Sequence, residues 1–278
     1  MTLPPSLAVF QHGPTDDGAR WLDGQLARSP ADVLAALPVV LPALARRLGR
    51  EGLVGRVEHG GARVDLTSWR RCDGAGFRLF AAADPVPDTV LLDLYARGDL
   101  EERTVVLRAI TLRPLCDATS KLLDEVQRSN IVAHLEAACL DSNLLVRALD
   151  GGLLSRDRFD RMVLKVAFND LPLARMLDVA ARPGPELSRM LQGLATEREA
   201  AGRSVWRDTC RLTAGAPVPG TVARVLGDLE HGDAGRRLAA AEALATLRRP
   251  DLLPFARERV AREDKPDVRL ALERALAS

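Results

Sequence analysis

The sequence predicts an all-α protein, arranged as a HEAT-like right-handed helical repeat array (an α-solenoid). Three observations favour this fold class. Aromatic residues make up only 4% of the chain, so the core must be built from Leu, Ala and Val, and Leu and Ala are good helix formers. Helix-length apolar patterns, separated by Gly and Pro, follow one another from Pro87 onward. A short motif also repeats near the C-terminal end.

Residues 1–86 are predicted to form an N-terminal helical segment. Ser29 followed by Pro30 supplies a helix cap with proline in the first helical position. The helix that follows, over residues 31–49, should bend near Pro38 and Pro42, because proline removes a backbone hydrogen bond and clashes with the preceding turn.

One part of this segment departs from the helical pattern. Residues 55–66 alternate between apolar and polar types on either side of Gly60-Gly61, with Val57 and Val64 among the apolar members. A two-residue glycine turn between alternating stretches is typical of a β-hairpin. The same composition fits an irregular loop, so the sequence leaves both alternatives open.

Two further segments follow: a helical core over residues 87–212 and, after a turn-rich linker, HEAT-like repeats over residues 221–278. The motif R-x-A-x-x-x-A-L begins at Arg237 and again at Arg269, a spacing of 32 residues, and an Asp precedes each copy. In stacked helix pairs, Ala lets the helices approach closely. We therefore expect two antiparallel helix pairs stacked in register, with the motif Arg tied to an Asp of a neighbouring turn.

The composition argues against several classes of site. The formal net charge is +1, and the charges after residue 224 are nearly balanced, so no basic stripe for nucleic acid is expected. The four cysteines have long, irregular gaps and the histidines show no metal-ligand spacing. No metal site, cofactor, disulfide framework or catalytic residue is assigned, since the nucleophile-elbow, Walker and dinucleotide-binding motifs do not occur.

The sequence also bears on localisation. The longest apolar run, over residues 33–45, is too short to span a bilayer and contains two prolines. The first twelve residues lack a basic stretch followed by an apolar one, so no signal peptide is expected. We predict a cytoplasmic protein with reduced thiols and no membrane span.

The most unusual patch lies on the helix predicted after Pro185. An apolar stripe runs along this helix from Leu187, and on a helical wheel Glu197 and Arg198 fall inside the stripe. Charged residues are rarely buried unless they are paired. The two residues therefore indicate either a structural ion pair with another helix or a polar pocket that binds a ligand, and both are expected to be buried with charged partners.

Two other basic residues have open interpretations. If a helix runs through Arg128, this residue lies in line with Leu135 and could be the partner of Glu197; if the helix begins at Ser129 or Asn130, either of which can cap it, Arg128 is a loop residue. Lys165 lies at the edge of another apolar stripe, one turn after a second basic residue. That basic pair either holds a phosphate or carboxylate or forms a solvated face.

The same region resembles the EboA family, whose members carry W-N-x-M-V-L-K-A-x-F and, about thirty residues on, E-L-A-R-M-L-x-x-x-A-x-E-R-W-A-A-G-R. The resemblance covers roughly residues 84–212. The matching residues here are Met162 to Lys165, Phe168, Glu186-Leu187, Met190-Leu191, Glu197-Arg198 and Ala200 to Arg203, with Arg128 to Val132 similar to an upstream R-T-N-V run. The chain departs at aromatic positions: Phe159-Asp160 stands for Trp-Asn, Glu199 for Trp, and Cys210 for Trp.

The resemblance implies a function. EboA-like proteins are associated with gene clusters for the biosynthesis and trafficking of secondary metabolites, alongside prenyltransferase-like and TIM-barrel-like proteins. The chain is expected to be a non-enzymatic scaffold or binding protein whose partner is a protein or a small metabolite. The candidate binding residues are Arg128, Asn130, Lys165, Glu197, Arg198 and Arg203.

Two alternatives belong to other classes. The first is an enzyme with an inter-helix site around Glu197, which requires that carboxyl group to lie in a deep cavity as an acid or base. The second, ranked last, is a nucleic-acid-binding HEAT-like protein, which requires a concave basic surface.

Overall fold

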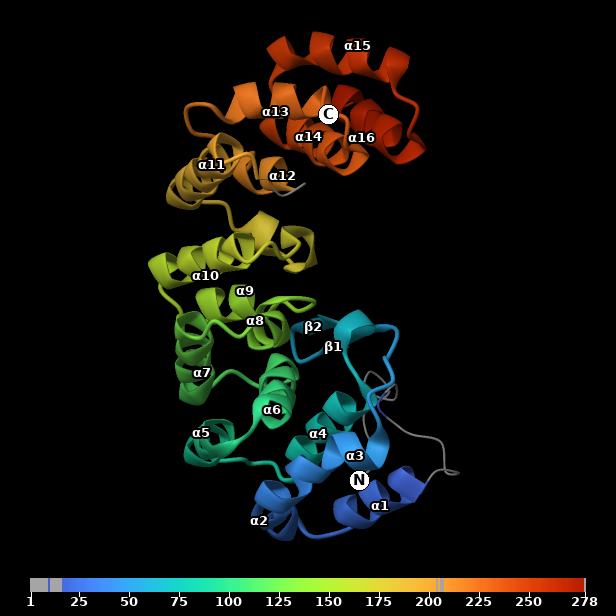
Figure 1. The fold of residues 1–278 in the computed structure, drawn as a ribbon, viewed down its shortest axis with the longest axis vertical. Coiled ribbons are helices and arrows are strands. Elements are labelled where there is room, and N and C mark those ends of the chain that lie inside the picture. The colour runs from blue at the N-terminus through green and yellow to red at the C-terminus, as the bar shows by residue number, and fades with distance from the viewer. Residues whose placement is uncertain (1–9, 11–16, 204, 206–207, 278) are drawn as a thin grey trace. The chain divides into compact units, whose positions relative to one another are not determined.

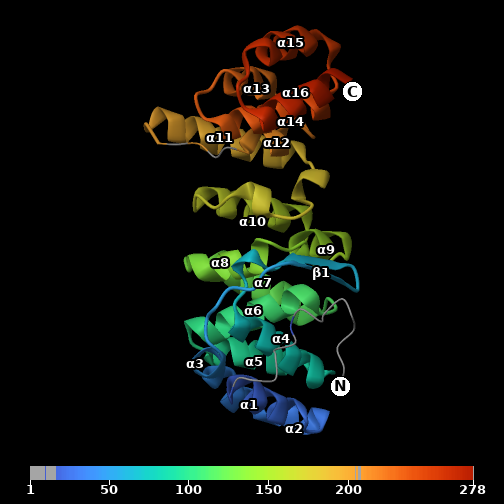
Figure 2. The same ribbon diagram turned by 90° about the vertical axis from the view of Figure 1, so that its right-hand side faces the viewer.

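The computed structural model describes Phe10 and residues 17–203, 205 and 208–277. The remaining residues include most of the first twelve, so the expectation about a signal peptide lies outside the described part. The chain forms two compact units, Met1–Ser155 and Arg156–Ser278, which are described separately (Figures 1 and 2).

The first unit combines helices with one small sheet. Its helices and strands are α1 (Asp17–Leu26), α2 (Pro30–Val40), η2 (Leu41–Ala43), α3 (Leu44–Leu48), β1 (Arg56–His59), β2 (Ala62–Asp65), η3 (Leu66–Ser68), α4 (Arg71–Ala82), α5 (Asp88–Arg97), α6 (Leu100–Leu112), α7 (Asp117–Arg128), α8 (Val132–Cys139) and α9 (Leu144–Asp150).

All the regular structure described in the second unit is helical. Its elements are α10 (Arg156–Phe168), η4 (Leu173–Arg175), η5 (Val179–Ala181), α11 (Pro185–Ala200), α12 (Thr209–Thr213), α13 (Thr221–Leu229), α14 (Ala234–Leu247), η6 (Pro250–Leu252), α15 (Leu253–Arg262) and α16 (Pro266–Ala277). The all-α prediction is confirmed (Figure 1). The right-handed HEAT-like array stays a prediction.

Local signals in the first unit act as the sequence predicts. The Ser29 hydroxyl accepts a hydrogen bond from the backbone N–H of Asp32 at 3.3 Å, with Pro30 at the start of α2. The helical run then changes to the 3-10 helix η2 at Pro42 before α3 resumes. The predicted break is therefore found at Pro42, whereas Pro38 lies inside α2 without ending it.

The hairpin alternative is correct for residues 55–66. β1 and β2 pair antiparallel with Val57 opposite Val64, and both side chains are buried. The turn residues Gly60 and Gly61 have φ of 55° and 80°, a conformation that glycine adopts without steric cost. The Asn143 side chain holds the hairpin in place: its Oδ1 accepts from the Arg63 N–H at 2.8 Å, and its Nδ2 donates to the Gly61 carbonyl at 3.1 Å.

The end of the second unit is a closely packed set of helices. α14 contacts α12, α13 and α16, and α15 contacts α16. The core here is built largely from alanine, leucine and valine, and Ala240, Leu244 and Leu272 are buried in it with Leu276 packed against it. Small side chains on α14 allow this close approach, as the repeated motif predicts.

A buried charged centre joins α14, α15 and α16. The Glu263 carboxylate, 1% exposed, accepts two hydrogen bonds from Arg237, at 2.8 and 2.9 Å, and two from Arg259, at 3.0 and 2.9 Å. The backbone N–H of Lys265 donates a fifth at 3.1 Å. The hydrogen bonds from Arg237 are the main reason that the pKa of Glu263 lies far below its ordinary value.

Both motif arginines meet at this centre. Arg237 of α14 binds the Glu263 carboxylate, and Arg269 of α16 donates to the Glu263 carbonyl oxygen. Arg237 does form an ion pair with an Asp of a neighbouring turn, since Asp264 lies 3.5 Å from its guanidinium. Its main partner, however, is the buried Glu263, which the sequence did not indicate. Asp233, the Asp that precedes the first motif copy, caps α14 by accepting from the Arg236 N–H.

Glu263→Gln should destabilise the protein by roughly 3–5 kcal/mol at neutral pH, because it leaves Arg237 and Arg259 without their buried counter-charge. The free energy of unfolding measured in urea tests this. Glu258→Gln is the matched control on α15; its side chain is 71% exposed, and the expected change is within about 0.5 kcal/mol.

The effect should also depend on pH in one direction. Because the folded-state pKa of Glu263 is lowered from 4.5, its ionic contribution is complete above about pH 4.5 and declines as the pH falls below that value. The difference between wild type and Glu263→Gln should therefore narrow between pH 5 and pH 3. A difference that stays constant or widens on acidification would contradict the assignment.

Candidate functional site

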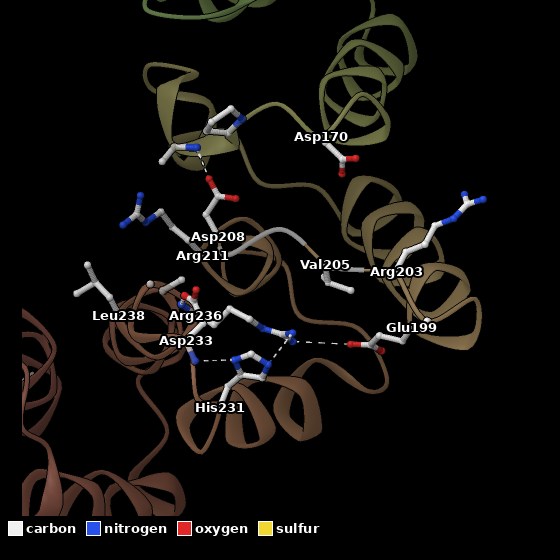
Figure 3. Close-up of a pocket in the computed structure, with 15 residues that line it drawn as sticks. Asp170, Glu199, Arg203, Val205, Asp208, Arg211, His231, Asp233, Arg236 and Leu238 are labelled. Atoms are coloured by element: carbon white, nitrogen blue, oxygen red, sulfur yellow. Dashed lines mark hydrogen bonds and ion pairs between the residues drawn. The ribbon is translucent and has the colours of Figure 1, made fainter.

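A cavity in the second unit lies where the end of α11 meets α12 and α14 (Figure 3). Its volume is about 970 Å³, within the usual range for small-molecule sites. The lining residues are Asp170, Pro172, Ala174, Glu199, Gly202, Arg203, Val205, Asp208, Arg211, His231, Asp233, Gly235, Arg236, Leu238 and Ala239.

The C-terminal end of α11 places Arg203 at the rim of this cavity. Gly202 follows the helix with φ of 66°, and the N–H of Arg203 donates to the Arg198 carbonyl at 2.8 Å. This is the hydrogen-bond pattern of a helix that ends on a left-handed glycine. The Arg203 side chain is exposed, and none of the described residues forms an ion pair with it.

An ion-pair network closes one side of the cavity. Glu199 of α11 accepts two hydrogen bonds from Arg224 of α13, at 2.7 and 3.1 Å, and lies 3.7 Å from Arg236 of α14. Arg236 also donates to the buried Asp228 carboxylate. The hydrogen bond from Arg224 is the main cause of the lowered pKa of Glu199. Figure 3 shows Arg236 between Glu199 and His231.

The network continues into the core through a thiol. Cys210 of α12 donates from its Sγ to the other oxygen of Asp228 at 3.1 Å. Burial raises the pKa of the Cys210 thiol far above its ordinary value, and the neighbouring Asp228 charge adds to this effect. Cys210 is therefore placed as a buried hydrogen-bond donor to Asp228.

Asp208 forms part of the opposite wall. Its side chain is 7% exposed and accepts a hydrogen bond from the backbone N–H of Ala174, in the 3-10 helix η4. Burial is the main cause of the raised pKa of this carboxyl group. Arg211 also lines the cavity, but its guanidinium binds Glu242 at 2.6 Å.

The prediction for Glu197 is wrong, and that for Arg198 is right in part. Glu197 is exposed, whereas the Arg198 side chain is 11% exposed and pairs with Asp170 at 2.5 Å. The reason is helix geometry: at about 100° per residue, Arg198 lies nearly in line with Leu187, whereas Glu197 is displaced from that line by roughly 80°. Asp170 therefore supplies the charged partner of Arg198.

Arg128 lies neither in the middle of a helix nor in a loop, the two alternatives that the sequence left open. It is the last residue of α7, exposed, and paired with Glu125 of the same helix at 2.6 Å. Asn130 is exposed in the short turn before α8, where the Ser129 hydroxyl accepts from the Ile131 N–H at 3.1 Å. The described partner of Arg128 is therefore Glu125, within its own helix.

The predicted candidates divide between the two units. Arg128 and Asn130 belong to the first unit, and Lys165, which is half-buried on α10, belongs to the second with Glu197, Arg198 and Arg203. Of the six, Arg203 alone lines the 970 Å³ cavity, and Arg198 reaches it through Asp170. Their role in binding stays a prediction.

The enzyme alternative depended on a deep site around Glu197. This residue lines a separate cavity of about 910 Å³ along the outer face of α11, together with Glu186, Arg189 and Gln192 among others. No His, Cys or Lys is among the described residues that line it. The exposed position of Glu197 differs from the deep site that the enzyme alternative requires.

Two further kinds of feature concern the residues that the structure describes. In that part of the chain, no group of three His, Cys, Asp or Glu side chains is arranged to hold a metal ion. No helix within the described ranges has both the length and the apolar character needed to cross a bilayer.

Several residues of the site carry no local signal in the sequence. Asp208, His231 and Arg236 lie on three different segments, and a single sequence does not show that these meet. Glu199 is the exception. It stands where the resembled family has Trp, and that replacement of an aromatic by a carboxylate could have directed attention to a search for new arginine partners.

The comparisons with known proteins concern the stretch that ends at this cavity. Residues 87–214 match the family model of the metabolite traffic protein EboA. The predicted EboA resemblance is thereby confirmed over just under half of the chain. No curated protein and no solved structure matches this chain. The EboA match includes the cavity residues from Asp170 to Arg211, whereas those from His231 to Ala239 lie beyond it.

Replacing the two charged residues of α11 should have unequal effects. Arg198→Ala is expected to cost about 1–2 kcal/mol, since it removes a mostly buried stem and a charge-assisted hydrogen bond to the solvated Asp170. Glu197→Ala should change the free energy of unfolding by less than about 0.5 kcal/mol, as is usual for an exposed side chain. Urea unfolding of both variants measures this, and equal losses would contradict the structural assignment.

Proposed function

We propose that this chain is a non-enzymatic metabolite-binding protein, and that it holds a small acid in the cavity at the end of α11. The observation that supports the proposal is the cavity itself, whose volume of about 970 Å³ is that of a ligand site. The last part of the segment that matches the metabolite traffic family lines this cavity. A role in the biosynthesis or trafficking of secondary metabolites is part of the same proposal.

The choice of an acid follows from the charges at the cavity. Arg211 binds Glu242, Arg236 binds Asp228, and Arg198 binds Asp170, so these guanidiniums are already neutralised. The Arg203 guanidinium has no carboxylate partner among the described residues and stands at the rim. A carboxylate or phosphate entering the cavity would meet a cation that can form two parallel hydrogen bonds with it.

The binding interpretation is favoured over turnover because two reactive groups, one at the cavity and one beside it, are held in structural pairs. Cys210 is occupied as a donor to Asp228, and Glu199 is occupied by Arg224. Catalysis requires a nucleophile or base that faces the substrate with an orienting partner. A protein partner could approach the same rim, as the scaffold interpretation requires.

Native mass spectrometry of the purified full chain tests for a co-purifying small molecule, which should be acidic and should be released chemically unchanged. Arg203→Ala should weaken its binding roughly tenfold, the effect of one charge-assisted hydrogen bond. The melting temperature should change little, because the Arg203 side chain is exposed.

Arg189→Ala is the matched control. Arg189 is an exposed arginine on the same helix, paired with Glu186, and lines the separate cavity that contains Glu197. Its replacement removes the same charge and should leave ligand occupancy unchanged. If Arg189→Ala and Arg203→Ala weaken binding equally, the effect is one of overall charge and the proposed site is wrong.

A further inference from the structure

We infer that the ligand is bifunctional: besides its acid group it carries an N–H or O–H hydrogen-bond donor. The Asp208 carboxylate is the group that accepts a hydrogen bond from this donor. The inference rests on the proposed function, because it assigns a second contact in the same cavity. The ligand class that follows is an amino acid or hydroxy acid in the broad chemical sense.

The first step is the state of Asp208. A carboxylate that is 7% exposed has lost most of its hydration and needs compensating hydrogen bonds or a counter-charge. Ala174 supplies a backbone N–H to one oxygen. The Asp208 backbone N–H and the charge of Arg211 also favour the ionised carboxylate, but no described side chain forms an ion pair or a hydrogen bond with it.

The second step compares Asp208 with the other carboxylates at the cavity. Asp170 pairs with Arg198, Glu199 pairs with Arg224, and Asp233 caps α14. Each of these three therefore has a structural role that explains its charge. Asp208 stands at the N-cap position of α12, yet its side chain makes no cap hydrogen bond there.

The third step is the chemistry that fits such a group. A buried carboxylate on the wall of a cavity has unused acceptor capacity, which an ammonium or hydroxyl group can fill. Burial raises the pKa of Asp208, and a bound ammonium group would favour its charged form. With Arg203 exposed at the rim and Asp208 buried in the wall, the ligand would place its donor inside and its acid group outside.

The experiment compares matched probes on the full chain. The plain acids are butyrate, caproate and caprylate; the counterparts carry an ω-amino or ω-hydroxy group on the same chains, so that several separations between the two groups are sampled. Dissociation constants are measured by ligand-observed NMR. For at least one chain length, wild type should bind the amino or hydroxy acid roughly fivefold or more tightly than the plain acid. The amino and hydroxy series distinguish the two kinds of donor.

Two variants assign the contacts. Asp208→Asn retains the shape and an acceptor for Ala174 while removing the charge, and it should abolish the preference for the amino acid. Arg203→Ala should weaken the plain and substituted acids by the same factor, roughly tenfold, and leave the preference in place.

The outcomes separate the two proposals. If the acids bind in an Arg203-dependent manner but wild type shows no preference for a donor group, the present inference is overturned and the proposed function stands. If the preference exists but survives Asp208→Asn, Asp208 is not the acceptor. If no acid binds, or Arg203→Ala has no effect, both proposals fail. The wild-type comparison remains decisive even if Asp208→Asn does not fold.

Discussion

The second unit depends on one constraint: arginines carried into an alanine-rich helix interface must find carboxylates there. Small side chains bring α14 close to its neighbours, and the guanidiniums of Arg236 and Arg237 are then mostly removed from water. Asp228 and Glu263 neutralise them. A buried arginine that loses its carboxylate partner is strongly destabilising, so each of these arginines requires a carboxylate at the same interface.

The same constraint shapes the cavity. Glu199 joins α11 to α13 and α14 through Arg224 and Arg236, so the end of the EboA-matched segment is fixed to helices beyond it. Family members resembled by this stretch have Trp where Glu199 and Cys210 stand. Here both positions belong to one polar network, with Cys210 bonded to Asp228. The aromatic side chains are therefore replaced by hydrogen-bonded pairs that leave a polar wall.

Local sequence patterns predicted much of the fold. The remaining features depend on contacts between segments that are far apart in the sequence. The Ser29 cap, the break at Pro42 and the hairpin at Gly60-Gly61 all follow from residues close in sequence. Helical periodicity also predicts the burial of Arg198, but it does not bury Glu197, which lies roughly 80° from the line through Leu187. Asp208 and Glu263 could not be predicted as buried, because their surroundings come from segments that a single sequence does not bring together.

The composition of the cavity wall has a consequence for divergence among chains that share the EboA segment. Arg203 and Asp208 lie within the matched residues, whereas His231, Asp233 and Leu238 lie outside them. Substitutions after residue 214 could change the shape of one side of the cavity without changing Arg203 or Asp208, the residues proposed to bind the polar groups of a ligand. Related chains could then differ in the carbon skeleton of the ligand they prefer, while the two proposed polar contacts to the ligand stay the same.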